Sequence, residues 1–429
     1  MQEIQLKRQE YSGVGETLYK TKLPNGLRLF LVPKPDFHET YGIMTTRFGS
    51  IDTTIIQEDG QERTYPDGIA HFLEHKLFED ENGQDLLREF VKLGAESNAF
   101  TSFTKTSYLF STTNRVKESV NLLQTLVSKG HFTQESVERE KGIIQQEIEM
   151  YQDDPDYRLF FQTLANLYPN SPLSADIAGT NSSIDEIEVK DLEENFERFY
   201  HPSNMSLFLV GNIDVNEVLN WVGDSQEKWN VQAQLLPHCQ KVPLHPIIST
   251  GTMRMEVATP KLAIGLRGKD EIEEYELFRY KIALKLLFAM MFGWTSKRFQ
   301  QYYETGKLDT SLTLEVEVEK EFHFVMLTMD TMEPLSISHQ MRSAIRQFAK
   351  DKDVSEEHLD TIKSEMFGDF LHGLNSLEYI ATQYETHLEG ENLFDIPKIL
   401  QSMSLTDVLE IGSRFISQAD IVDFTIFPK

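Results

Sequence analysis

Two histidines and a glutamate lie within five consecutive residues of this chain, in the order His71, Glu74 and His75. If the segment is helical, residues four apart lie on one face one turn apart, so both imidazoles can bind a single metal ion. Glu74 lies three residues from His71 and next to His75, so its carboxylate also reaches that face. Zinc makes bound water acidic near neutral pH, and a nearby carboxylate can accept the proton. The spacing therefore predicts hydrolytic metal chemistry.

The same residues have a plainer explanation, because two histidines and a glutamate can decorate an exposed helix face without binding anything. Against this, histidine-x-x-glutamate-histidine is rare by chance and is the inverted form of the commoner zinc-peptidase motif. A zinc ion held by two imidazoles needs at least one more protein ligand and an open position for water. A further acid is therefore expected elsewhere in the chain.

Three acids close to the motif are poor candidates for the third ligand. Glu79 continues the same helix face, but it lies a further turn along and too far from His71. Asp67 and Asp80 lie at the two ends of the predicted helix, where aspartate suits capping.

A second predicted helix, which begins after Thr133, offers better candidates. Glu140 and Glu147 are seven residues apart, so they lie nearly on one face after two turns, whereas Glu149 points to the opposite side. The spacing alone leaves the choice between Glu140 and Glu147 open.

The surrounding elements are predicted from alternation, apolar periodicity and turn residues. Both halves of the chain run strand, helix, strands, helices and closing strand, which indicates an internal duplication. We therefore expect an α+β fold of two homologous halves, each a mainly antiparallel sheet packed with helices. The first half has strands at 27–32, 41–48, 98–112 and 206–210, and helices at 69–78, at 116–129 and from 134. The second has strands at 261–266, 311–318, 322–329 and 421–427, and helices at 275–292, 334–350 and 355–371.

The length of 429 residues suits two domains. A proline-containing stretch of mixed polar composition separates the halves and predicts a linker. The expected organisation is a zinc-binding peptidase domain at 1–225, a linker at 226–250, and a second homologous domain without the motif at 251–429.

The formal net charge of −27 disfavours nucleic acid and anionic membrane surfaces as partners and suits a cationic peptide, although it also simply promotes solubility. Cys239 is the only cysteine, so no intramolecular disulfide can form. The chain begins without a signal-peptide pattern, and its most apolar run, 286–292, is too short to span a bilayer. We therefore expect a soluble, cytoplasmic protein.

Residues 68–75 resemble the zinc helix of the pitrilysin/insulinase peptidases, the family that includes the mitochondrial processing peptidase. The chain is similar to the two-domain bacterial members and to the beta subunit of that peptidase, and the resemblance implies their metallohydrolase fold. Further stretches that resemble the family are Leu23–Leu27, Asn98–Thr101, Glu138–Glu140, Gln146–Ile148, Tyr200–Met205 and Val210–Asn212.

This resemblance implies roles for individual residues. It makes Glu74 the general base and Glu140 an acid that orients the site. The implied zinc ligands are His71, His75 and Glu147, and the implied substrate-binding edge strand consists of Asn98, Ala99, Phe100 and Thr101.

One stretch departs from the family pattern. Self-sufficient members carry an Arg and a later Tyr that bind the substrate carbonyl, but here Tyr303 occupies the Arg position. The Tyr position falls near Asp309 or Thr310, and Arg298 comes too early in the pattern. A dimer is therefore expected, either a homodimer or a heterodimer with a related chain that supplies the Arg/Tyr pair.

The resemblance implies a zinc-dependent endopeptidase that cleaves short, unfolded and preferably cationic peptides in a closed chamber. One alternative is a non-catalytic assembly subunit of a processing-peptidase-like complex. Another is a metal-dependent hydrolase of small molecules, which the motif allows but the two-half architecture disfavours.

Overall fold

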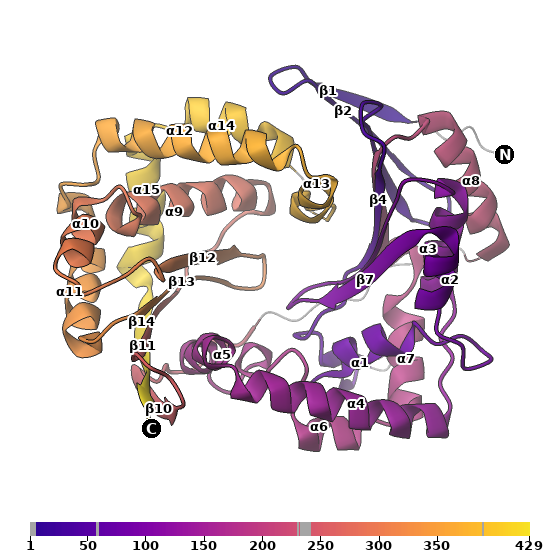
Figure 1. Cartoon of the computed structure of the whole chain (residues 1–429), viewed down its shortest axis with the longest axis horizontal. Coiled ribbons are helices and arrows are strands. Elements are labelled where there is room, and N and C mark those ends of the chain that lie inside the picture. Colours follow the sequence, from indigo (N-terminus) through magenta and orange to yellow (C-terminus); the bar gives the residue numbers. More distant parts are fainter. Residues whose placement is uncertain (1–5, 57–59, 230, 232–241, 388–389) are drawn as a thin grey trace. The chain divides into compact units, whose positions relative to one another are not determined.

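The computed structural model describes residues 6–56, 60–229, 231, 242–387 and 390–429. The chain forms two compact units, each drawn in Figure 1. Unit 1 comprises Met1–Ile148, Asp176–Gln240 and His372–His387, and unit 2 comprises Glu149–Ala175, Lys241–Leu371 and Leu388–Lys429. None of the described helices is both long enough and apolar enough to cross a bilayer.

A seven-stranded sheet with the order β1-β2-β3-β9-β4-β8-β7 forms the centre of unit 1. Neighbouring strands are antiparallel except for β3 and β9, which are parallel. Every residue of β4 and β9 is buried, so the core lies around these central strands. The strands are β1 (Lys7–Tyr11), β2 (Glu16–Lys22), β3 (Arg28–Pro33), β4 (Thr40–Thr46), β7 (Ala95–Thr101), β8 (Thr106–Thr112) and β9 (Met205–Gly211); β5 (Thr54–Ile56) and β6 (Glu62–Thr64) form a separate hairpin.

The helices of unit 1 bury amphipathic faces against this sheet. In α3, Val120, Leu123 and Val127 recur at helical spacing and are fully buried. The helix α3 packs on β8 and on α8, whereas α1 and α2 pack on β7. The helices are α1 (Ile69–Lys76), α2 (Leu87–Leu93), α3 (Val116–Ser128), α4 (Gln134–Asp153, whose last turn belongs to unit 2), α6 (Asn181–Glu186), α7 (Val189–Phe199), α8 (Val215–Trp229) and α13 (Leu377–Gln383).

Unit 2 has a five-stranded sheet with the order β10-β14-β11-β13-β12. Its strands are β10 (Thr250–Met255), β11 (Lys261–Arg267), β12 (Thr313–Val318), β13 (His323–Asp330) and β14 (Asp420–Pro428). The apolar helix α9 packs on β12 and on α15, which explains why most of its residues are buried. The helices are α5 (Pro155–Leu167), α9 (Leu277–Phe292), α10 (Lys297–Glu304), α11 (Pro334–Arg346), α12 (Glu356–Gly373, whose last residues belong to unit 1), α14 (Ile396–Ser402) and α15 (Leu405–Gln418).

The two sheets repeat one topology. The equivalent strands, in chain order, are β3, β4, β7, β8 and β9 in unit 1 and β10, β11, β12, β13 and β14 in unit 2. Equivalent strands have equivalent neighbours within these two sets. The one parallel pair of each set is also equivalent, β3 with β9 and β10 with β14. Each sheet is further covered by a helix from the other half of the sequence: α5 packs on β11 and β14, and α13 packs on β4 and β9.

The predicted fold class is confirmed: the chain is α+β with two related halves, and each sheet is mainly antiparallel with one parallel pair. The domain limits 1–225 and 251–429 remain a prediction. Residues 149–175 of the first half of the sequence belong to unit 2, and residues 372–387 of the second half belong to unit 1. Much of the predicted linker 226–250, together with Cys239, lies outside the described residues.

Candidate metal centre

The helix α1, which carries both histidines, starts at Gly68. Gly68 has a φ of 90°, and a Cβ there would lie 2.6 Å from the carbonyl oxygen of Ala178, so this position requires glycine. The prediction that Asp67 caps the helix is wrong, because Gly68 holds the capping position and no side chain caps it. The main-chain oxygen of Asp67 instead accepts a hydrogen bond from the Ser183 hydroxyl at 2.9 Å.

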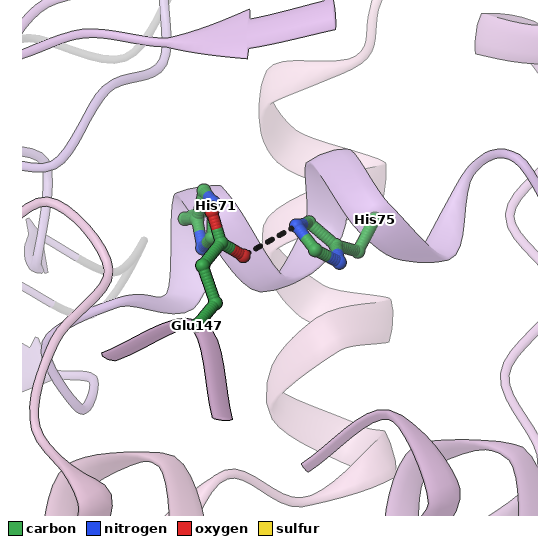
Figure 2. A group of neighbouring side chains, drawn as sticks. All are labelled: His71, His75 and Glu147. Atoms are coloured by element: carbon green, nitrogen blue, oxygen red, sulfur yellow. Dashed lines mark ion pairs between the residues drawn. The ribbon is translucent and has the colours of Figure 1, made fainter. Parts of the chain in front are cut away.

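The structure brings His71, His75 and Glu147 together, with one ligand atom from each within 4.8 Å of the others. Glu147 Oε1 lies 3.8 Å from His71 Nε2, and Glu147 Oε2 lies 3.4 Å from His75 Nε2. Figure 2 shows the Glu147 carboxylate beside the two imidazoles on the face of α1. From the seven-residue spacing on α4, either Glu140 or Glu147 could be the third ligand. The structure places the two carboxylates on different sides of His75.

Glu140 lies on the other side of the His75 ring, where its Oε1 is 3.0 Å from Nδ1. A carboxylate at this nitrogen accepts the Nδ1 proton, so Nε2, which faces Glu147, is the nitrogen available to a metal once its own proton is lost. Glu140 therefore orients His75, whereas Glu147 faces the ring nitrogens on which a metal would bind. Glu149 is exposed on the far side of α4.

A second polar cluster joins the two helices that carry these residues. Glu79 accepts hydrogen bonds from Lys76 and, at 2.7 Å, from Arg139. Lys76 follows His75 and is completely buried, whereas Arg139 precedes Glu140 on α4. Sequence reasoning considered Glu79 only as a ligand and missed this role; its three-residue spacing from Lys76 was the available signal. We call the group Lys76, Glu79 and Arg139 the helix clamp.

The two imidazoles have opposite pKa shifts. Burial, together with repulsion from His75, lowers the pKa of His71 to about 4, so this ring is neutral near pH 7. Burial also disfavours charge on His75, but hydrogen bonds to Glu140 and Glu147 and the charge of Glu74 outweigh it and raise its pKa to about 10. The position between these carboxylates thus strongly favours a positive charge.

These residues fit a zinc ion. Nitrogen and oxygen ligands 2.0–2.1 Å from a tetrahedral zinc lie roughly 3.3 Å apart. The distance of 3.4 Å from Glu147 to His75 matches this, and the distance of 3.8 Å from Glu147 to His71 is slightly longer. Two imidazoles and one carboxylate are also the donor set of catalytic zinc sites that keep a position open for water. The other ring nitrogen of His71, Nδ1, is buried without a hydrogen-bond partner in the described part of the chain, so packing alone orients that ring.

Glu74 connects the cluster to the edge of the sheet. Its Oε2 accepts a hydrogen bond from the Thr101 hydroxyl at 2.5 Å, and burial raises its pKa. Among the described strands, β7 pairs only with β8, so its other edge is open next to this carboxylate. On β7, Asn98 is exposed and its Oδ1 accepts from the Ala99 N–H at 2.9 Å, while Phe100 is partly buried.

The stretch that departs from the family pattern lies in unit 2. Tyr303 is exposed on α10 and stacks on Phe299. Arg298 is engaged locally, because it donates to Asp351 at 2.6 Å and to the Met291 carbonyl at 2.9 Å. Asp309 accepts from the Ser311 N–H at 2.8 Å.

The repeated fold and the histidine–histidine–glutamate cluster define the class of a two-domain metallopeptidase-like protein. Residues 60–181 match the model described as Insulinase (Peptidase family M16), and residues 186–366 match the Peptidase M16 inactive domain. This chain belongs to peptidase family M16, the insulinase family.

Individual relatives agree with this assignment. The chain is 37% identical to the uncharacterized zinc protease YmfH of Bacillus subtilis over 99% of its own length and 100% of that protein. A crystal structure from Alicyclobacillus acidocaldarius, described as M16-like, has a TM-score of 0.89 at 29% identity, with 100% of this chain and 99% of that chain covered. A protease from Helicobacter pylori shares the fold, with a TM-score of 0.82 at 17% identity over 96% and 99% of the two chains.

Proposed function

We propose that this protein is a zinc-dependent endopeptidase that cleaves short, unfolded peptides. One observation carries the proposal: in unit 1, the cluster of His71, His75 and Glu147 accompanies a buried glutamate that is hydrogen-bonded to an open edge strand. Relatives named zinc proteases support zinc as the metal.

Each part of this site has a task in peptide hydrolysis. Zinc, when bound by the two histidines and Glu147, would polarise the peptide carbonyl and acidify the attacking water. Glu74 would take the proton from that water and deliver it to the leaving amine, while Thr101 holds the carboxylate through Oε2. Glu140 would keep the Nδ1 proton of His75, so that Nε2 is the nitrogen that binds the metal.

The substrate would add to β7 as an antiparallel or parallel strand, since main-chain groups of an edge strand bind extended peptides without much sequence selectivity. This addition would replace the local bond between Asn98 and the Ala99 N–H. Because Thr101 belongs to the same strand, it would align the bound peptide with Glu74. The net charge of −27 favours basic peptides.

The test is peptide hydrolysis by the purified protein, with elemental analysis in parallel. We expect the protein to contain zinc, to lose cleavage of quenched-fluorescence peptides when a chelator removes the metal, and to recover it when zinc is restored. Basic peptides should be cleaved faster than acidic peptides of equal length, and folded proteins should resist. A zinc-loaded protein that cleaves no peptide would contradict the proposal.

The proposal includes a second subunit, because Tyr303 stands where the family pattern has the Arg of the carbonyl-binding pair. The two subunits would enclose the substrate in a closed chamber, as the family resemblance implies. A phenol lacks the fixed charge of that Arg, and losing one such donor typically costs about 10²-fold in rate. Titration with a family chain that carries the Arg/Tyr pair should raise hydrolysis by about that factor. A lone protein that already works at the full rate would refute the split site.

The presence of Tyr303 in place of the family's Arg also favours one alternative function, that of a non-catalytic assembly subunit. The second matched family model, described as an inactive domain, covers this stretch. Under this alternative, zinc would bind, but no peptide would be cleaved by the protein with or without a related chain. Hydrolysis that disappears in a Glu74 variant would exclude it.

The helix clamp gives a separate prediction. Glu79→Gln leaves the fully buried Lys76 without its anion, so we expect the free energy of unfolding to fall by about 3 kcal/mol. Because Glu79 also joins α1 to α4, zinc affinity should fall by about 10–100-fold. Denaturant titration and competition with a zinc-chelating dye measure the two effects.

The matched control is Glu149→Gln, which removes one exposed carboxylate from α4. We expect this control variant to leave the free energy of unfolding and the zinc affinity near their wild-type values. Unchanged zinc affinity in Glu79→Gln, with stability lowered, would show that the clamp only supports folding.

A further inference from the structure

An outward ridge of α11 in unit 2 separates two surface pockets. His339 and Ser343 on α11 and Gln347, which directly follows it, are spaced four residues apart, and all three line both pockets. One pocket of about 590 Å³ lies between α11 and α10, and the other, of about 580 Å³, is also lined by Leu335 and Thr250. We call the linings of the two pockets the α11 face.

The charge of the α11 face is opposite to that of the chain. The whole sequence has 68 Asp and Glu against 41 Lys and Arg, a clear acidic excess. The linings instead contain twice as many basic residues as acidic ones. The basic residues are Lys297, Arg298, Arg342, Arg346, Lys350 and Lys352, and the acidic ones are Asp351, Asp353 and Asp423.

Only two of these basic side chains are neutralised locally. Arg298 donates to Asp351 at 2.6 Å, and Arg342 donates to Asp423 at 2.8 Å. The other four are exposed, and their side chains form no hydrogen bond or ion pair with the described residues: Lys297, Arg346, Lys350 and Lys352. Unpaired cations flanking two grooves give this face a local positive potential.

One apolar side chain of the α11 face and another just before α11 in the chain are exposed. Leu335, which lines the second pocket, is 74% exposed, and Met332 just before α11 is 72% exposed. Methionine and arginine are enriched in protein interfaces, and grooves that combine apolar anchors with cations suit polypeptides. A phosphate chain fits less well, because it carries a charge at every repeat, whereas a peptide can place carboxylates opposite the cations and apolar side chains against Leu335 and Met332.

We propose that the α11 face is a docking surface for an acidic polypeptide segment of a partner protein. Its carboxylates would lie opposite the four unpaired basic side chains, and apolar side chains would cover Leu335 and Met332. None of these residues belongs to the proposed zinc site, so the proposal stands or falls independently of the peptidase function.

The experiment measures binding of a fluorescein-labelled peptide of Glu-Glu-Leu repeats to the full chain by fluorescence anisotropy. We expect binding that weakens as salt is added, because salt screens exposed charges. The variant R346E/K350E reverses two exposed, unpaired charges and should weaken binding by about tenfold or more, which corresponds to about 1.4 kcal/mol. Thermal unfolding checks that this variant is folded.

The matched control is K129E/K228E, which makes the same charge change at two exposed lysines of unit 1. It should bind the acidic peptide nearly as well as the wild type does. Self-association of the chain that disappears only in R346E/K350E would instead identify a second copy as the occupant and overturn the proposed partner.

Three results would overturn the proposal that the α11 face binds an acidic polypeptide. The first is no binding of the acidic peptide by the wild-type protein. The second is equal weakening in both variants, which would show a general charge effect. The third is tighter binding of polyphosphate than of the peptide, which would identify a phosphate site instead.

Discussion

Glu74→Gln is expected to lower peptide hydrolysis by about 10²–10⁴-fold, the range for loss of a general base, while zinc content stays at the wild-type level. Glutamine has the same shape, and its amide oxygen can still accept the Thr101 hydroxyl that Oε2 accepts at 2.5 Å. The amide cannot take a proton from water, so the chemical step alone is removed. Zinc content should persist because Glu74 is not one of the three clustered ligand residues.

The measurements are elemental analysis, peptide hydrolysis and substrate binding on the same preparation. Glu149→Gln, an exposed substitution on α4, is the control for loss of one carboxylate and should retain full activity. Activity of Glu74→Gln within a few-fold of the wild type would remove Glu74 from the role of base. Loss of zinc in this variant would instead make it a ligand.

His75→Ala is expected to abolish stoichiometric zinc, because it removes a nitrogen that lies 3.4 Å from the Glu147 carboxylate in the cluster. Glu147→Gln should also lose the metal, since a neutral amide is a poor replacement for an anionic ligand. Glu140→Gln should retain zinc with about 10–100-fold weaker affinity, because Glu140 acts through Nδ1 of His75. Full zinc content in His75→Ala would refute the site.

The high pKa of His75 adds a pH dependence to zinc loading. In the metal-free protein its pKa is raised to about 10, so below that pH a proton occupies the imidazole and zinc must displace it. Zinc affinity should therefore rise with pH by about tenfold per pH unit below the pKa of His75. Titrations in buffers of different ionisation enthalpy would detect the released proton. A pH-independent affinity would contradict this coupling.

The sequence by itself determined the local parts of this protein. Four-residue spacing places His71 and His75 on one helix face wherever that helix lies, because helical geometry depends only on neighbours in the chain. Short apolar runs likewise predicted strands that the structure contains, such as β3 and β9, and longer apolar segments predicted helices such as α9. Even the duplication was visible as a repeated order of elements.

Local rules were less reliable at the ends of elements. Asp67 has the right residue type for a helix cap, yet Gly68 adopts a left-handed conformation and takes that position. The deciding contact is with Ala178, more than a hundred residues away, so no window around Asp67 could have shown it.

Only the tertiary structure decided which distant groups meet. Glu140 and Glu147 lie on one face of α4 and are equivalent by spacing, but packing of α4 beside α1 directs Glu140 to Nδ1 of His75 and Glu147 to the Nε2 atoms. The bond between Thr101 and Glu74 and the helix clamp arise from the same packing. The exchange of α5 and α13 between the halves is also invisible in the sequence, because each helix buries its apolar face on strands far away in the chain. The hydrophobic effect is non-directional. The spacing of apolar residues along a helix can therefore show that one face is apolar, but it cannot show which distant surface covers that face.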